Sequence, residues 1–198
     1  SKTDVLVAGG ISYWTWIERK PALSQLKESV EEQAKVMASS GADFLILEMM
    51  IDIEQMLVTL KAAKTAGLPI WVGLSCILND KGHLCLEDGD LLSDAISVLS
   101  SDDIDAIHIM HTEIENVLPS LKALKSSWSG LIGVYPNSST YANSLDLKST
   151  EWAFEDVIAT DKFIRHAKKW NDFGVNFIGG CCGINVDHIK KLSKIIKK

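Results

Sequence analysis

Two adjacent cysteines in a glycine-rich segment are the residues of this chain best suited to chemistry. Cys181 and Cys182 follow Gly179 and Gly180 and precede Gly183. Glycines let the backbone turn tightly and approach a ligand closely. Neighbouring side chains normally diverge, but a sharp turn can aim both sulfurs at one ion. Two thiolates and one further soft or borderline ligand then occupy three corners of a zinc tetrahedron and leave the fourth open to a substrate.

A zinc site of this kind favours alkyl transfer to a thiol. A free cysteine-like thiol has a pKa of about 8.5, and coordination to a metal removes its proton outright. The thiolate is a good nucleophile towards a methyl group on a sulfonium or ammonium centre. The competing interpretation is that Cys181 and Cys182 are small buried apolar residues. The glycine frame and the position after an apolar run favour the metal site.

The composition is that of an ordinary globular chain. Its 198 residues are 46% apolar and 23% charged, which suits one domain with a sizeable core. The net charge of -6 argues against a nucleic-acid surface, which needs a basic stripe. No apolar run reaches the roughly 18 residues of a membrane span. The first residues also lack the apolar stretch of a signal peptide, so we expect a cytoplasmic protein.

The four cysteines are expected to be free, catalytic or metal-bound rather than paired in disulfides, because the chain shows no secretory signal. Cys76 ends a predicted strand, where packing is favoured over ligation. Cys85 falls in a polar loop, which we place at 79–89, and is expected to be incidental.

Six strand–helix units must position these groups. Apolar runs predict strands at 5–10, 43–48, 69–76, 106–111, 131–135 and 175–180. Apolar residues at helical spacing predict helices at 24–40, 53–66, 91–99, 114–126, 159–173 and 186–197. Gly41 and Gly67 are placed as stops of the first two helices. The strands are apolar throughout, which is typical of a parallel sheet covered by helices.

Two architectures fit this alternation, a doubly wound sheet and a barrel, and both gather their chemistry at the C-terminal ends of the strands. Those ends carry most of the reactive groups: Gly9, Gly10, Glu48, Ser75, Cys76, His111, Tyr135, Asn137, Cys181 and Cys182. The chain contains neither a dinucleotide-binding glycine motif nor a Walker lysine pattern. The Ser- and Asn-rich stretch 137–148 is predicted to be an active-site loop.

The cysteine segment, together with residues 185–189, resembles the zinc motif of the homocysteine S-methyltransferase family. The resemblance continues in order and spacing through four further segments, 7–10, 41–48, 71–76 and 134–138. It therefore covers nearly the whole chain. The double cysteine is specific, whereas the other segments are weak individually and convincing in series.

The resemblance implies a TIM-type (β/α)8 barrel, a zinc ion held by three cysteines, and methyl transfer to the sulfur of homocysteine. Cys181 and Cys182 match the paired zinc ligands, and Glu48 matches the residue that holds the homocysteine amino group. The alternative for Glu48 is an acid that complements a helix dipole. The matched segments add four predicted substrate-binding residues: Ser75, Asn137, Gly179 and Gly180.

One departure from the family pattern concerns the third zinc ligand, because His111 occupies the position of the expected cysteine. Histidine is a normal zinc ligand, so a His/Cys/Cys site is chemically possible. Such a site is less negative by one charge than a site of three thiolates. We therefore expect poorer catalysis or a preference for another thiol. The alternative is a hydrogen-bonded histidine without metal. His108 shares a strand face with Met110 and points away from His111, so we do not count it as a ligand.

The other departure is length. A (β/α)8 barrel typically needs about 250 residues, and the six units here match the last six of the family. We therefore expect residues 1–198 to form a single, N-terminally shortened barrel domain that lacks the first two strands. A fragment, a barrel completed by a second chain and a shortened relative all remain open. An open barrel exposes strand edges, which predicts a homo-oligomer.

Three hypotheses about function follow. The first is zinc-dependent methyl transfer to the thiol of homocysteine or a similar thiol, from a small-molecule donor that the sequence does not identify. The second is a catalytically impaired or non-catalytic relative or fragment. The third is a different barrel enzyme that uses no metal. Trp14 and Trp16 could contact a cationic donor, although aromatic residues serve packing first.

Overall fold

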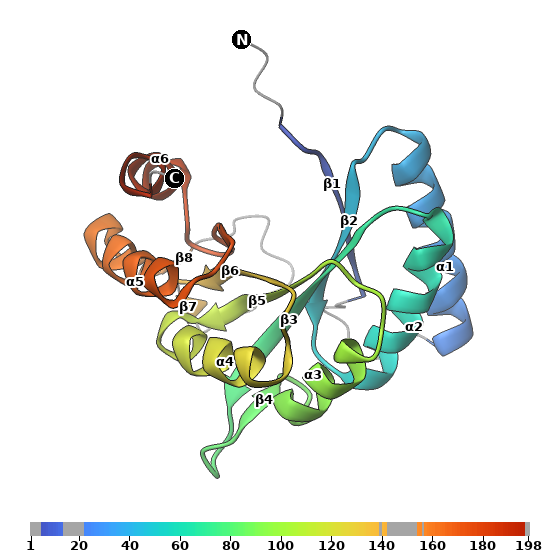
Figure 1. The fold of residues 1–198 in the computed structure, drawn as a ribbon, viewed down its shortest axis with the longest axis horizontal. Helices are drawn as coiled ribbons and strands as arrows, with labels where there is room; N and C mark the ends of the chain where they lie inside the picture. The colour runs from blue at the N-terminus through green and yellow to red at the C-terminus, as the bar shows by residue number, and fades with distance from the viewer. Residues whose placement is uncertain (1–4, 14–21, 139, 142–153, 156, 197–198) are drawn as a thin grey trace.

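The chain folds around a parallel sheet whose strands follow chain order, as a computed structural model shows (Figure 1). The structure describes residues 5–13, 22–138, 140–141, 154–155 and 157–196. The six parallel strands pair successively in the order β1 (Ala8–Ser12), β2 (Phe44–Met50), β3 (Ile70–Leu78), β5 (Ala106–Glu113), β6 (Leu131–Asn137) and β9 (Phe177–Ile178).

A helix follows most of these strands and covers the outer side of the curved sheet (Figure 1). The helices are α1 (Leu23–Ser39), α2 (Ile53–Ala63) with the short 3-10 helix η1 (Lys64–Ala66), α3 (Leu92–Ser100), α4 (Ile114–Ser127), α5 (Thr160–Phe173) and α6 (Val186–Ile195). Gly41 and Gly67, the predicted helix stops, both take left-handed backbone. The strand–helix alternation is confirmed, and its order is that of a TIM-type barrel rather than a doubly wound sheet.

The two faces of the sheet differ in character. Every second strand residue is fully buried in the main hydrophobic core, as Leu47, Val72 and Ile109 illustrate. The opposite, concave face mixes small residues such as Gly73 and Gly133 with aromatic and polar groups, including Glu48 and Tyr135, which are half-buried. Burial on both faces explains why the sequence of these strands does not alternate in polarity.

The described strands form an arc of a barrel. Within the described residues, β1 pairs only with β2, and β9 pairs only with β6. The sheet is therefore a partial TIM-type arrangement with two free ends, in agreement with the expected incompleteness.

The structure corrects the prediction for the segment 79–89. A short strand, β4 (Leu84–Leu86), lies there and pairs antiparallel with β3. Cys85 is fully buried in that strand instead of being incidental in a polar loop. The sequence does not predict β4, because three residues are too few to show a strand period. Two further short strands, β7 (Thr140–Tyr141) and β8 (Phe154–Glu155), pair with each other.

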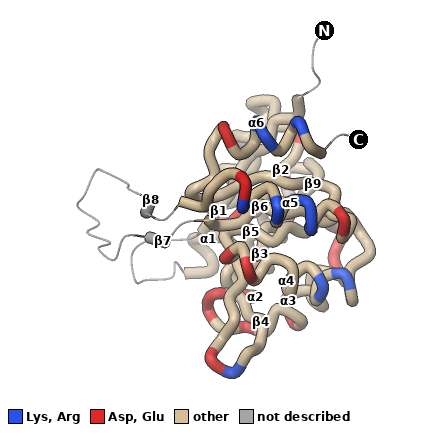
Figure 2. Tube along the Cα trace, turned by 90° about the vertical axis from the view of Figure 1, so that its left-hand side faces the viewer, with Lys and Arg blue, Asp and Glu red and all other residues tan. Residues whose placement is uncertain are grey.

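Acidic and basic residues are interspersed along the helices (Figure 2). The basic residues of α5 and α6 are accompanied by acids, and Lys191 of α6 pairs with Asp161 of α5. No helix in the described part of the chain combines the length and apolarity needed to cross a bilayer.

Candidate metal centre

The cysteine pair lies in a tight turn directly after β9. The backbone N–H of Ile184 donates to the carbonyl of Cys181 at 3.2 Å and closes the turn. Gly183 takes a left-handed backbone with φ of 76°, which glycine adopts without steric cost. Gly180 has a different reason to be glycine, since a Cβ there would lie 2.1 Å from Cγ2 of Ile184. Glycines thus permit the turn on both sides of the sulfurs.

Backbone hydrogen bonds to the end of β6 hold this turn in place. The N–H of Gly179 donates to the carbonyl of Val134 at 2.8 Å, and that of Cys181 to the carbonyl of Pro136 at 3.0 Å. In return, the N–H of Ser138 donates to the carbonyl of Cys182 at 3.0 Å. The sulfurs are therefore carried by a fixed loop at the C-terminal end of the sheet.

His111 reaches the same place from the end of β5. Its backbone is left-handed, with φ of 44°, which is uncommon for a residue other than glycine. The register between β5 and β6 also shifts between Met110 and Glu113. Strict alternation of side chains consequently stops at this point, and the His111 ring lies beside the cysteine turn. His108 lies outside the cluster, as expected, and stacks on Trp71 with ring centroids 5.0 Å apart.

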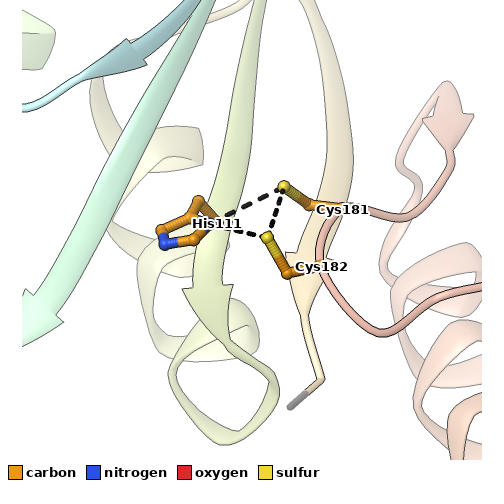
Figure 3. A group of neighbouring side chains, drawn as sticks. All are labelled: His111, Cys181 and Cys182. Atoms are coloured by element: carbon orange, nitrogen blue, oxygen red, sulfur yellow. Dashed lines mark hydrogen bonds between the residues drawn. The ribbon is translucent and has the colours of Figure 1, made fainter. Parts of the chain in front are cut away.

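The three side chains form a close triangle (Figure 3). Nδ1 of His111 lies 3.6 Å from Sγ of Cys181 and 3.6 Å from Sγ of Cys182, and the two sulfurs are 3.7 Å apart. Usual zinc–ligand bond lengths at tetrahedral angles give spacings of about 3.6 Å between nitrogen and sulfur and about 3.8 Å between sulfurs. The donor set and its spacing therefore fit three corners of a tetrahedral metal site.

The electrostatics of the cluster favour a cation. The hydrogen bond shared with Cys182, burial and the charge of Cys182 together raise the pKa of the Cys181 thiol. Burial on its own lowers the pKa of His111, but the hydrogen bond and charge of Cys182, with the charge of Glu87, outweigh it and raise that pKa. Two thiols so close together resist losing both protons unless a positive ion lies between them.

Glu48 and Tyr135 face the same end of the sheet. Burial raises the pKa of Glu48, which is half-buried at the end of β2. Burial, the charge of Glu48 and the charge of Cys181 all raise the pKa of Tyr135. The Tyr135 hydroxyl is buried without a hydrogen-bond partner among the described residues. Glu48 lies close enough to the cysteine turn for its charge to help raise the pKa of Cys181.

Comparison with known proteins matches residues 1–196 to the family model of homocysteine S-methyltransferase. The chain belongs to the homocysteine S-methyltransferase family. Homocysteine S-methyltransferase 1 of Zea mays is 26% identical over 176 residues, which are 87% of this chain and 52% of the maize protein. This family member therefore spans about half the length of the curated relatives that it matches.

Solved structures of the homocysteine methyltransferase MmuM from Escherichia coli share the fold of this family member. The apo form has a TM-score of 0.72 at 21% identity, over 96% of this chain and 63% of the other. The metallated form has a TM-score of 0.68 at 21% identity, over 90% and 54% of the two chains. A likeness at this identity supports the fold, and the metallated form shows that a relative takes up metal.

The other residues of this family member that are predicted to bind substrate lie at or just after the C-terminal ends of β3, β6 and β9. Asn137 is half-buried at the end of β6, and Gly179 and Gly180 lead into the cysteine turn. Ser75 is fully buried, and its hydroxyl donates to Oε1 of Glu87 at 2.5 Å. Their roles in substrate binding stay predictions. Trp14, Trp16 and residues 142–148 of the predicted active-site loop lie outside the described residues.

Sequence reasoning missed Glu87. It lies just after β4, inside the segment 79–89 that the sequence predicts to be a polar loop. An acid in such a segment is usually a solvated surface residue. Only the antiparallel pairing of β4 with β3 brings it to the strand ends, and the sequence carried no recognisable signal for that strand.

Proposed function

We propose that this chain binds zinc through His111, Cys181 and Cys182 and serves methyl transfer to the thiol of homocysteine or a similar thiol. The observation that supports the proposal is the triangle of one imidazole nitrogen and two sulfurs at 3.6, 3.6 and 3.7 Å. Mixed nitrogen and sulfur donors in this geometry suit zinc better than magnesium or calcium, which take oxygen ligands. Family membership supports the reaction class.

Different residues of the chain would bind the thiol and the amino group of the substrate. When bound, zinc would supply the positive charge that keeps a substrate thiol deprotonated at neutral pH. The cysteine turn and His111 leave one side of the triangle for that thiol. Glu48 would pair with the substrate ammonium group, because a half-buried carboxylate with a raised pKa gains stability from an incoming cation.

Metal analysis of the purified chain tests the zinc site. We expect about one zinc per chain, and loss of zinc in Cys181→Ser, Cys182→Ser and His111→Ala, because each change removes one of three ligands. Cys85→Ala is the matched control, since this free cysteine is fully buried elsewhere. A zinc content near zero in the unaltered chain, purified without chelator, would sink the proposal.

Titration calorimetry of the zinc-loaded chain with homocysteine separates a substrate-binding protein from a relative that has kept only the fold. We expect binding in the unaltered chain. Glu48→Gln should weaken it about 10-fold or more, because a charge-assisted hydrogen bond to the amino group contributes about 1.5–3 kcal/mol. Absence of binding by a zinc-loaded chain would instead favour the non-catalytic alternative.

A further inference from the structure

Glu87 is an acid beside the metal centre to which the proposed function assigns no role. It is half-buried, and its Oε1 accepts a hydrogen bond from the hydroxyl of Ser75 at 2.5 Å. Ser75 is itself fully buried near the C-terminal end of β3. A carboxylate bonded to a buried hydroxyl at the strand ends has a defined position, unlike a solvated surface acid.

The chain around Glu87 is also held on both sides. The N–H of Leu86 donates to the carbonyl of Asp90 at 2.8 Å, and the N–H of Gly89 donates to the carbonyl of Leu86 at 3.0 Å. The next residue, Asp88, is tied through its N–H to the carbonyl of Ile51 at 3.0 Å. These hydrogen bonds therefore fix the backbone position of Glu87 between β4 and the turn after it.

That place adjoins His111. Ser75 is the register partner of Met110, the residue immediately before His111 on β5. Because Glu87 bonds to Ser75, its carboxylate lies near the end of β3, next to the strand that carries His111. Glu87 nevertheless does not belong to the group of ligand atoms that lie within 4.8 Å of one another. The carboxylate is therefore a neighbour of the cluster and is not itself a ligand in this arrangement.

The orientation of His111 supplies a role for such a carboxylate. Nδ1 is the ring nitrogen that faces the two sulfurs, and the other nitrogen lies on the far side of the ring (Figure 3). A metal-bound histidine usually donates its second ring N–H to a carboxylate or carbonyl, which fixes the tautomer and raises the basicity of the donor nitrogen.

We infer that Glu87 is a positioning residue for His111. Its carboxylate, which Ser75 holds in place, orients the imidazole and raises the affinity of the imidazole for the metal. The inference rests on the proposed zinc site. It explains why β4 and its turn bring a carboxylate to this end of the sheet. It also gives a neutral histidine ligand the negative partner that a thiolate ligand would not need.

Zinc affinity, measured on the whole chain by competition with a chromophoric chelator, tests the inference. Glu87→Gln should weaken zinc binding about 10- to 100-fold, the range found when the partner of a metal-bound histidine is changed. Asp88→Asn is the matched control, because it removes the same charge from the adjacent, exposed residue and should leave the affinity unchanged. Glu87→Asp, which keeps a carboxylate, should recover part of the lost affinity.

A double-mutant cycle shows whether Glu87 acts through His111. In a His111→Cys background the ligand has no second ring N–H, so Glu87→Gln should have a several-fold smaller effect there. Equal losses in both backgrounds, or no loss in the unaltered background, would overturn the inference while leaving the zinc site intact. If the cycle variant does not fold, recovery by Glu87→Asp decides the question, since a carboxylate without a role would restore nothing. An unaltered chain that binds no zinc removes the proposed function and this inference together.

Discussion

At the level of single residues, the cysteine pair could be identified from the sequence because the glycines on both sides of it indicate a tight turn. The turn that points both sulfurs to one place depends on Gly183 in left-handed backbone and on the absence of a side chain at Gly180. His111 was found through the family resemblance, since a histidine at a strand end has many ordinary roles. Glu87 could not be found, because its position depends on a hydrogen bond to Ser75 across 12 residues.

His108 gives a prediction about stability and pH. Its ring is buried on the concave face, both nitrogens lack hydrogen-bond partners among the described residues, and burial lowers its pKa from 6.5 to about 4. Between these values the unfolded chain binds the proton more readily than the folded chain. Stability is therefore retained above pH 6.5 and lost as the pH falls towards 4, by about 2 kcal/mol at pH 5.

Urea unfolding of the metal-free chain at pH 7 and pH 5 measures this loss. His108→Leu should reduce the difference between the two pH values by about 2 kcal/mol, because it removes the group that gains the proton. His83→Gln is the control, since His83 is exposed and its removal should leave the difference as it was. A His108→Leu chain with the same pH dependence as the unaltered one would mean that His108 is not the group responsible.

At the level of strands and helices, the sequence predicted which elements exist far better than how the strands end. Periodicity is a property of several residues, so the six helices and their partners were predicted within a few residues. The ends of β2 and β5 depend instead on Met49 and His111, whose φ angles are 56° and 44°, and on register shifts beside them. Such local departures are set by tertiary packing and leave no pattern in composition.

The pairing of β5 with β6 gives a second prediction. Gly133 is the register partner of His108, and a Cβ at Gly133 would lie 2.3 Å from Nδ1 of that ring. The ring cannot move away freely, because it packs against both Trp71 and Phe177. Gly133→Ala should therefore destabilise the chain by about 1–3 kcal/mol in urea unfolding, the usual cost of overpacking.

The control for this substitution is Gly179→Ala. A Cβ at Gly179 meets its nearest atom, Cβ of Tyr135, at an ordinary 3.5 Å, so the change should cost little or even stabilise the chain. If both alanine variants unfold at the same urea concentration as the unaltered chain, the His108 ring has room that the structure does not show.

At the level of the whole molecule, the sheet is an arc with two ends rather than a closed ring in the part of the chain that the structure describes. The sequence predicted this from the number of strand–helix units, because a complete barrel needs eight. What the count could not show is how apolar the edge beside β1 is. Val5, Leu6 and Val7, which lead into β1, are 74%, 64% and 57% exposed.

An apolar strand edge is a template for pairing with another chain, so we expect the 198-residue chain to self-associate. Sedimentation velocity over a range of concentrations should show dimers or larger species that dissociate on dilution. Val7→Lys should shift the distribution towards monomer, because a charge at the edge opposes strand pairing. Val36→Lys is the matched control, since Val36 is equally exposed, at 57%, on the surface of α1. A single monomeric species at every concentration would show that the edge is protected in solution, and equal effects of the two lysines would mean that association depends on overall charge rather than on the β1 edge.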